Sequence, residues 1–315
     1  MADGIMVSVI CNAYQHENVI RDALEGFVMQ KTNFPFEVLI HDDASSDGTA
    51  AIIREYEEKY PEIIKPIYSK ENQYSKRDGS LPRLQYGRVK GKYIAFCEGD
   101  DYWTDPEKLQ KQFDALEAHP EVDMCAHAAS MRVGDELTRV ISPSSEETLL
   151  SAEQVIAGGG GYFATNSLFY RAELQQTQYP FRKVLPFDYS LQILGSLRGG
   201  IWFLPDNMSV YRYLSSATSW TSKMKTDSAK RAVHLNRVVK MLSQLDVDTD
   251  RRYHEVIQER VDKLSLKALL LEGKYREVLK EHKEELKKYP FSKRAFIRLG
   301  TVFPGLAGAI WKNQQ

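Results

Sequence analysis

The chain has 315 residues, and 43% of them are hydrophobic, which suffices for one large α/β domain and a smaller appendage. The formal net charge is −1, so the overall charge does not indicate a nucleic-acid partner. Three widely spaced cysteines in apolar segments indicate buried thiols in a reducing compartment, not a zinc site. Because the first residues lack the basic and then apolar pattern of a secretion signal, we expect a cytoplasmic protein.

Strands and helices alternate in the first third of the sequence. Short apolar runs predict strands at residues 6–11, 37–41, 63–68 and 93–97. Apolar residues at helical spacing predict helices between them, at residues 17–29, 49–60 and 81–90. This alternation predicts an α/β fold with a mostly parallel central sheet and helices on both faces. In such a sheet, ligands bind at the carboxyl ends of the strands.

The segment that follows is less regular. It contains further predicted strands, at residues 122–128, 131–141, 165–170, 201–204 and 208–213. Helices are predicted at residues 151–157 and 189–197. The four consecutive glycines at 158–161 indicate either a loop that passes close to a ligand or a flexible connector.

From about residue 224 the pattern is helical to the end. The predicted helices cover residues 224–245, 249–271, 274–288 and 291–299. We therefore expect a first domain at residues 1–222 and a C-terminal all-helical domain at 223–315. The apolar tail at 296–311 is too short for a membrane span. Either this tail and the basic residues of 223–240 contact anionic lipid, or the basic residues form an ordinary solvated helix face.

Three acids are crowded at the end of the strand at 93–97. Glu98, Asp100 and Asp101 repel one another, and a bound cation would relieve this repulsion. Carboxylate oxygens suit Mg²⁺ or Mn²⁺. An acidic turn before a helix would give the same sequence. The residues alone leave both interpretations open.

Three motifs resemble those of the family 2 glycosyltransferases of the GT-A fold. They are VSVI at residues 7–10 with Tyr14, DDASSDGT at 42–49, and EGDD at 98–101, in the order and spacing of that family. The resemblance covers about residues 5–213. It implies an inverting transfer, of the hexosyltransferase type, from a nucleotide-diphosphate donor to an acceptor hydroxyl. The donor would be UDP-linked, and the reaction would serve bacterial surface polysaccharide or glycan synthesis.

The same resemblance implies roles for particular residues. Ala13 and Tyr14 would line the nucleotide, and Asp42 or Asp43 would accept a hydrogen bond from its base. Nucleotide or diphosphate contacts are also expected from Glu98, Asp100 and Arg212. Asp100 and Asp101 would hold the metal, Mn²⁺ or Mg²⁺, and Asp188 would be the general base. A simple helix-capping role is the alternative for Asp188.

The chain departs from the family pattern at three places. The usual proline of the first loop is Asn12, the common Glu-Asp pair is Phe187-Asp188, and the histidine of a Tyr-Arg-x-His turn is Leu214. The first departure changes the stiffness of the loop, the second leaves only one acid to serve as base, and the third removes the side chain expected to contact metal or phosphate. Arg212 could approach the diphosphate or bridge the edge of the sheet.

Three aromatic residues, Trp103, Tyr162 and Trp220, are candidates for stacking on an acceptor sugar, although packing is the ordinary role of such side chains. The acceptor would be a glycan or a lipid-linked glycan, reached from the inner face of a membrane by peripheral contact through the C-terminal helices. Those helices could also pair two copies of the chain. Two other functions remain open: a nucleotidyltransferase, and a nucleotide-sugar or carbohydrate-binding module with a decayed catalytic centre.

Overall fold

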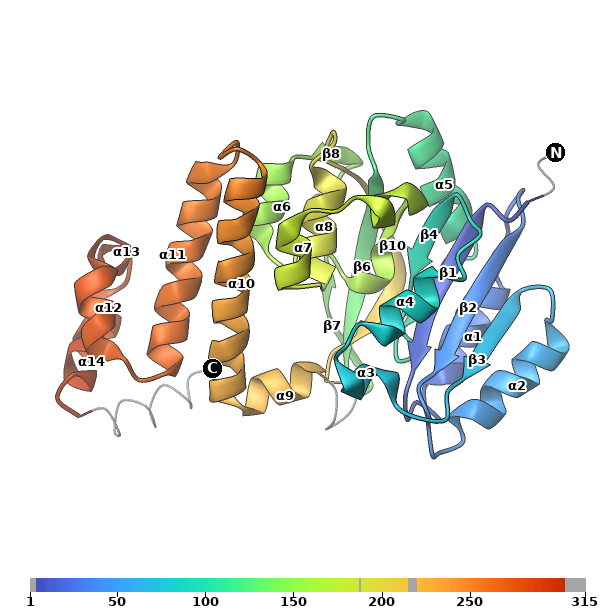
Figure 1. Cartoon of the computed structure of the whole chain (residues 1–315), viewed down its shortest axis with the longest axis horizontal. Coiled ribbons are helices and arrows are strands. Elements are labelled where there is room, and N and C mark those ends of the chain that lie inside the picture. The colour runs from blue at the N-terminus through green and yellow to red at the C-terminus, as the bar shows by residue number, and fades with distance from the viewer. Residues whose placement is uncertain (1–3, 187, 215–219, 304–315) are drawn as a thin grey trace. The chain divides into compact units, whose positions relative to one another are not determined.

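The computed structural model describes residues 4–186, 188–214 and 220–303, and the chain divides into two units (Figure 1). The first unit contains Met1–Gln178 and Leu191–Ser215, and the second contains Tyr179–Ser190 and Ser216–Gln315. The second unit thus includes residues 179–190, which precede the boundary predicted at residue 222.

The first part of the first unit alternates strands and helices as predicted. Its elements are β1 (Val7–Ala13), α1 (Ile20–Val28), β2 (Phe36–Asp42), α2 (Thr49–Lys59), β3 (Ile64–Tyr68), α3 (Gln73–Lys76), α4 (Ser80–Tyr86) and β4 (Tyr93–Phe96). In Figure 1, α4 lies in front of this part of the sheet and α1 lies behind it. Strand β2 is buried along its whole length, and β1 is buried except at Asn12, because helices cover both faces.

The remaining elements of the first unit complete the sheet. They are β5 (Tyr102–Trp103), α5 (Lys108–Ala118), β6 (Met124–Val133), β7 (Glu136–Ile141), β8 (Thr148–Leu150), α6 (Ala152–Gly158), β9 (Phe169–Arg171) and β10 (Ile201–Arg212), with 3₁₀ turns at Thr165–Ser167 and Ala172–Gln176. Helix α8 (Asp188–Ser196) begins in the second unit and ends in the first.

The strand order is β3-β2-β1-β4-β9-β6-β10-β5, with β7 beside β6 and β8 beside β10. Pairing is parallel from β3 to β4 and between β6 and β10. Short β9 runs antiparallel to both β4 and β6, so β6 and β10 point in the same direction as β1 to β4. Strands β1 to β4, β6 and β10 are therefore parallel as predicted, but the sheet is mixed because β5, β7, β8 and β9 run the other way.

Three predicted strand assignments are wrong in detail. The break predicted between residues 128 and 131 does not exist, because β6 continues to Val133 and the turn to β7 lies at residues 134 and 135. Residues 165–167 form a 3₁₀ turn, because the Asn166 side chain donates to the Val210 carbonyl (2.9 Å) and the Ser167 hydroxyl donates to the Ala164 carbonyl (2.7 Å). Residues 201–212 form one strand, which pairs with β6 through register shifts at Leu204 and Asn207. Local polar bonds and sheet irregularities of this kind leave no clear apolar period in the sequence.

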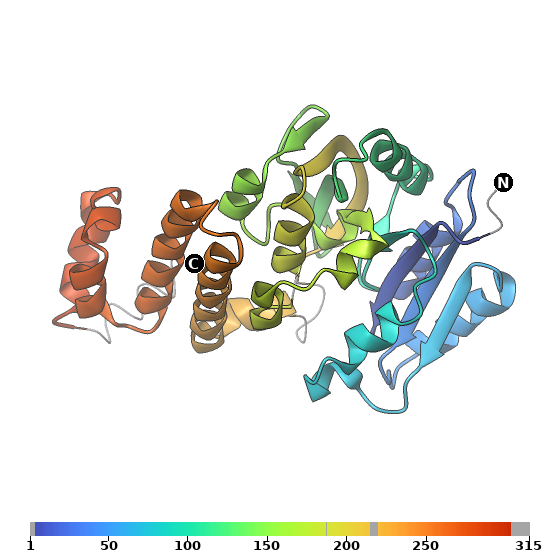
Figure 2. The ribbon, with the colours of Figure 1, turned by 45° about the horizontal axis from the view of Figure 1, so that its top comes forward.

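The described part of the second unit is helical. It contains α7 (Pro180–Val184), α9 (Trp220–Thr226), α10 (Ser228–Asp248), α11 (His254–Leu271), α12 (Tyr275–Glu281), α13 (Lys283–Lys287) and α14 (Phe291–Gly300). Helices α10 and α11 pack along each other, and α12, α13 and α14 gather next to the end of α11 (Figure 2). Their small core includes Leu270, Tyr275 and Ile297. None of the helices in the described residues is both long and apolar enough to cross a membrane.

Candidate functional site

The ends of β1, β2 and β4 meet at one edge of the sheet. These strands are adjacent and parallel, so the residues that follow them lie close together. Backbone hydrogen bonds join the ends: the N–H of Asp43 donates to the Ala13 carbonyl (2.9 Å), and the N–H of Gly99 donates to the Asn12 carbonyl (2.9 Å). The three sequence motifs are therefore brought together as expected for a ligand site of an α/β sheet.

Glu98 is bound by a residue of the neighbouring strand. Its carboxylate accepts hydrogen bonds from the backbone N–H of Asn12 (3.1 Å) and from the Asn12 side-chain amide (3.3 Å). These bonds connect the end of β1 to the end of β4. They give Glu98 a structural role, and its predicted contact with a nucleotide stays a prediction.

Asp43 has its carboxylate committed to a nearby helix. Its Oδ1 accepts from the N–H of Gln73 (2.5 Å) and its Oδ2 accepts from the N–H of Tyr74 (3.0 Å), so it caps the start of α3. These are N–H groups that have no partner within the helix. Asp43 thus anchors the segment between β3 and β4 to the edge of the sheet.

Asp42 is buried and retains an acceptor atom. Its Oδ2 accepts a long hydrogen bond from the N–H of Ser45 (3.4 Å), whereas its Oδ1 is buried without a partner among the described residues. A buried acceptor with no donor is costly, by about 1–3 kcal/mol. Of the two candidates for the base contact, Asp42 is therefore the one with a free oxygen.

Asp101, the last residue of the acidic motif, is buried. Its Oδ1 accepts from the backbone N–H of Arg212 (2.8 Å). Burial raises the pKa of Asp101 well above its ordinary value, and the charge of Asp100 raises it further. This is the physical signature of negative charges crowded in a poorly solvated place.

The acidic motif could supply only some of the ligands that a bound cation needs. Among the described residues, no group of three or more His, Cys, Asp or Glu side chains could hold a metal ion. Mg²⁺ commonly takes one or two carboxylates from the protein and completes its shell with water and substrate phosphates. Asp100 and Asp101 fit that pattern, because their crowded charge would be relieved by a cation.

Arg212 bridges β10 to α1 and to the acidic motif. Its guanidinium donates to the backbone carbonyl of Asp100 (2.8 Å), pairs with the carboxylate of Asp22 and lies 4.5 Å from the ring centre of Tyr102. The side chain is mostly buried. Arg212 therefore has the predicted bridging role in this structure. Its contact with a diphosphate stays a prediction.

His16 lies in the loop after β1, close to the acidic motif, and the sequence analysis did not identify it as a site residue. Burial lowers the pKa of His16, against the charges of Asp100 and Asp47, which raise it. Its Nδ1 is buried without a partner among the described residues, and a side chain at Gly99 would come within 2.9 Å of it. The available signal was its position two residues after Tyr14 in the same loop.

Trp103 was predicted to bind the acceptor, and this prediction is wrong for this structure. The side chain is only 2% exposed, and its Nε1–H donates to the carbonyl of Asn166 (3.1 Å). The ring also meets Phe27 edge-on with 5.0 Å between ring centres, and the ammonium of Lys108 lies 4.0 Å from it. Its faces are occupied by the protein, so no sugar can stack on them.

The other two aromatic candidates have different outcomes. Tyr162 is half-buried, lies 4.9 Å from Phe163 between ring centres, and packs so closely on Gly158 that a side chain there would clash with its ring. Packing thus explains the first of the four glycines. The side chain of Trp220 lies outside the described part of the structure, so its predicted role stays a prediction.

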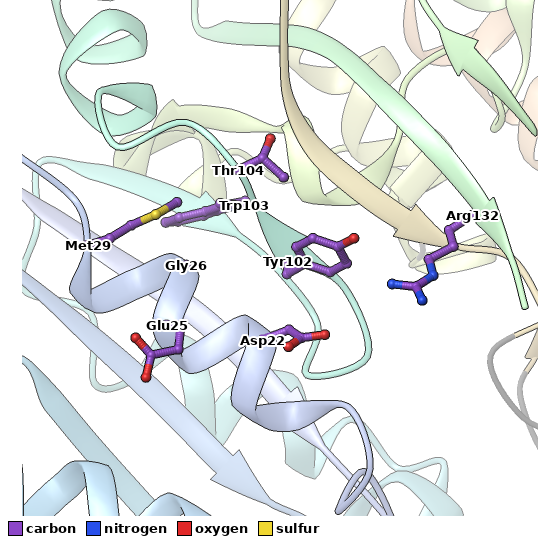
Figure 3. A pocket seen from close by; sticks show the side chains of 8 residues that line it. All are labelled: Asp22, Glu25, Gly26, Met29, Tyr102, Trp103, Thr104 and Arg132. Carbon is purple, nitrogen blue, oxygen red and sulfur yellow. The ribbon is translucent and has the colours of Figure 1, made fainter. Parts of the chain in front are cut away.

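An open pocket is lined by residues of α1, β5 and β6 and by their neighbours in the chain (Figure 3). Its lining residues are Asp22, Glu25, Gly26, Met29, Tyr102, Trp103, Thr104 and Arg132. The charged groups in it already have partners within the protein: Asp22 pairs with Arg212, Glu25 accepts from Tyr56, and Arg132 pairs with Asp135 (2.8 Å). The pocket therefore offers little polar chemistry of its own.

Asp188 is the first residue of α8 and belongs to the second unit. Its carboxylate accepts from the N–H of Tyr189, the next residue of the helix (2.7 Å). The neighbouring Phe187 lies outside the described residues. The assignment of Asp188 as a general base stays a prediction.

Comparison with known proteins identifies relatives of the first unit. The family model described as glycosyl transferase family 2 matches residues 8–179. An uncharacterized protein of Mycobacterium tuberculosis is 38% identical over 209 residues, which cover 65% of this chain and 58% of that protein. The chain thus spans little more than half the length of that relative. An Escherichia coli protein, UDP-Glc:alpha-D-GlcNAc-diphosphoundecaprenol beta-1,3-glucosyltransferase WfaP, is 32% identical over 112 residues, 36% of this chain and 42% of that protein.

A solved structure has the same fold. The crystal structure of S. aureus TarS residues 1–349 in complex with UDP-GlcNAc superposes with a TM-score of 0.59 at 16% identity, covering 92% of this chain and 78% of that chain. This likeness confirms the predicted GT-A fold with a C-terminal helical region. At that identity it is a statement about the fold alone.

Proposed function

Because this chain belongs to glycosyl transferase family 2, we propose that it transfers a sugar from a nucleotide-diphosphate donor to an acceptor hydroxyl, with inversion at the sugar carbon. The proposed donor is a UDP-linked sugar. The proposed enzyme is of the hexosyltransferase type. The names of two similar proteins support this choice, since one structure contains UDP-GlcNAc and one relative is named for UDP-Glc. The product would be a bacterial surface polysaccharide or glycan.

The unpartnered oxygen of Asp42 is the observation that carries this proposal. A pyrimidine such as uracil has one ring N–H, and a buried carboxylate oxygen is a strong acceptor for it. Binding would remove the cost of leaving that oxygen without a donor. Ala13 is the last residue of β1, the half-exposed Tyr14 follows it at the same edge, and both would line the nucleotide.

The acidic motif would take the diphosphate end of the donor. Asp100 and Asp101 would hold Mn²⁺ or Mg²⁺, which would neutralise charge on the departing diphosphate. Arg212 holds this motif in place, because its guanidinium donates to the backbone carbonyl of Asp100 and its backbone N–H donates to the carboxylate of Asp101. The motif is thus oriented before the donor binds, which electrostatic stabilisation requires.

The acceptor's proton needs a base, and Asp188 is our assignment. An acid at a helix N-terminus is stabilised in its ionised form, so it is available as a proton acceptor but is a weak base unless its surroundings raise its pKa. The proposed acceptor is a glycan or a lipid-linked glycan, as the name of the E. coli relative suggests. A lipid-linked acceptor would require peripheral contact with the inner face of a membrane, which we assign to the C-terminal helices.

A thermal-shift screen tests the donor site. The chain should gain thermal stability with UDP-sugars in the presence of Mn²⁺, more than with GDP-sugars or with Mn²⁺ alone. The Asp42→Ala variant should lose the shift with UDP-sugars. Absence of a shift with every nucleotide sugar contradicts the proposal. Slow, metal-dependent release of UDP from a bound UDP-sugar would show that the chain is an enzyme. A binding module with a decayed catalytic centre would not release UDP.

A further inference from the structure

Helix α14 has an apolar face that the described residues of its unit do not cover. Phe291 is 74% exposed, Leu299 42%, and, in the turn that continues the helix, Val302 66% and Phe303 55%. Ala295 is also exposed. Residues 291, 295 and 299 are four apart, and 302 and 303 follow at the next turn, so all five lie on one side. Backbone hydrogen bonds from residues 302 and 303 to the Leu299 carbonyl keep this turn in place (3.0 and 2.9 Å).

The opposite side of α14 fixes its orientation. Ile297 is fully buried in the small core of α11 to α14. A side chain at Gly300 would lie only 2.6 Å from the ring of Tyr275, so the helix backbone is in close contact with that ring. Because these contacts lock the helix, α14 cannot rotate to bury its apolar face against its own unit.

Charge distinguishes this end of the chain from the rest. The last acidic residue of the sequence is Glu285; residues 286–315 contain six Lys and Arg and no Asp or Glu. Arg294 and Arg298 lie on the helix beside the apolar face, and Arg298 is exposed. The whole chain has a formal net charge of only −1, so this basic segment is a local feature.

Helix α10, the other basic helix considered for lipid contact, does not combine a continuous apolar face with basic residues as α14 does. Its exposed valines, Val233 and Val247, are fourteen positions apart and do not form a continuous face. Two of its basic residues have local partners: Lys230 pairs with Asp227 (2.9 Å), and Arg237 donates to the Val184 carbonyl (3.4 Å). Among the basic stretches expected to meet lipid, α14 is therefore the better candidate.

We propose that α14 and the turn after it bind the surface of an anionic lipid bilayer. The apolar face enters the boundary between headgroups and acyl chains, while Arg294 and Arg298 contact lipid phosphates. A continuous apolar face beside basic residues, with no acid in the segment, is the pattern of an interfacial helix, and each basic residue near such a surface contributes about 1 kcal/mol. This inference rests on the proposed peripheral membrane contact and assigns it to a defined surface.

Vesicle sedimentation of the full chain tests this assignment. The chain should sediment with vesicles of phosphatidylcholine containing phosphatidylglycerol, should stay in solution with pure phosphatidylcholine, and should be released by salt. The triple variant F291S/L299S/F303S should bind at least ~10-fold more weakly, because it removes most of the inserted apolar area. The variant R294Q/R298Q should lose the preference for anionic vesicles.

The double variant V233S/V247S is the matched control, since it removes exposed apolar side chains from another helix of the same unit. It should bind vesicles as the unchanged chain does. Circular dichroism checks that every variant folds. Failure of the full chain to bind anionic vesicles overturns the inference, and so does equal binding by the triple variant. A dimer that the triple variant converts to a monomer would identify a second copy as the occupant instead. The nucleotide thermal shift does not involve α14, so it reports failure of the donor site separately.

Discussion

The carboxylate of Glu98 accepts hydrogen bonds from both the backbone and the side-chain nitrogen of Asn12. The backbone N–H of Asn12 therefore points to a side chain and not to a neighbouring strand. A proline at this position, as is usual in the family, would break no hydrogen bond of the sheet. The exchange of proline for asparagine thus adds a link between β1 and β4 without changing the sheet.

Substitution of Asn12 should separate the two bonds. Asn12→Ala removes the side-chain donor, and Asn12→Pro removes both donors, so the proline variant should be the less stable of the two by about 1.5–3 kcal/mol. Urea unfolding of both variants measures the difference. The control is the same pair of variants with Glu98 also replaced by Ala. The difference in stability between Asn12→Ala and Asn12→Pro should then disappear, and its persistence would show that Glu98 is not the acceptor that matters.

Replacing each of the two adjacent aspartates at the end of β2 should have a different effect. Asp43→Ala should release the start of α3, because Gln73 and Tyr74 lose their acceptor, and trypsin should then cleave after Lys76 or Arg77 faster. Asp42→Ala should leave that cleavage unchanged but weaken UDP binding at least ~10-fold. Limited proteolysis and calorimetric titration with UDP measure the two effects. Faster cleavage in Asp42→Ala, or unchanged UDP affinity, contradicts this division of roles.

Lys108 should make stability depend on pH. It is fully buried, donates to the Gln112 side chain (2.7 Å), and burial lowers its pKa to about 7 from 10.5. Between these two values the unfolded chain binds the proton that the folded chain does not, so the free energy of unfolding should rise with pH in this window. Lys108→Met should flatten that rise, by up to a few kcal/mol between pH 7 and pH 9.

Urea unfolding at pH 7, 8 and 9 checks this prediction, and the slope is the readout because Met also leaves Gln112 without its donor. Lys111→Met is the matched control on the same helix. The partners of Lys111, Asp105 and Asp206, raise its pKa, so its charge is constant over this range. Its loss should lower stability equally at the three pH values. Parallel slopes for the unchanged chain and Lys108→Met would disprove the account of Lys108.

Trp103→Phe should change stability and leave the acceptor's KM unchanged. Phenylalanine cannot donate to the Asn166 carbonyl and fills less of the space between Phe27 and Lys108. We expect a loss of about 1–3 kcal/mol in the free energy of unfolding. A raised acceptor KM with unchanged stability would restore the sugar-stacking role that the buried position excludes.

Asp188→Asn should retain donor binding and lose transfer by at least ~100-fold, the usual effect of removing a general base. Asp227→Asn is the control, because Asp227 caps α10 by accepting from the N–H of Lys230 (2.9 Å) and has no proposed catalytic role. Both variants should lose a similar, small amount of stability. Near-normal transfer by Asp188→Asn would leave only the capping role.

The α/β fold, the sheet edge that carries the site and the family resemblance follow from the amino-acid sequence alone. Apolar runs and helical spacings predict elements because burial follows local periodicity. Parallel adjacent strands bring residues 12–14, 42–43 and 98–101 together, since carboxyl ends of such strands share one edge. The mixed direction of the sheet was not predictable, because short strands such as β9 are recruited by contacts across the fold.

Contacts formed in the folded chain determine which side chains of the motifs are already bound to other parts of the protein. Asp42 and Asp43 are neighbours of the same type, yet Asp43 caps α3, whereas Asp42 has an oxygen without a partner in the part of the chain that the structure describes. Trp103 follows the acidic motif in sequence, but its ring is enclosed by Phe27 and Lys108. A side chain's role depends on partners tens of residues away, and neither residue type nor local spacing specifies those partners.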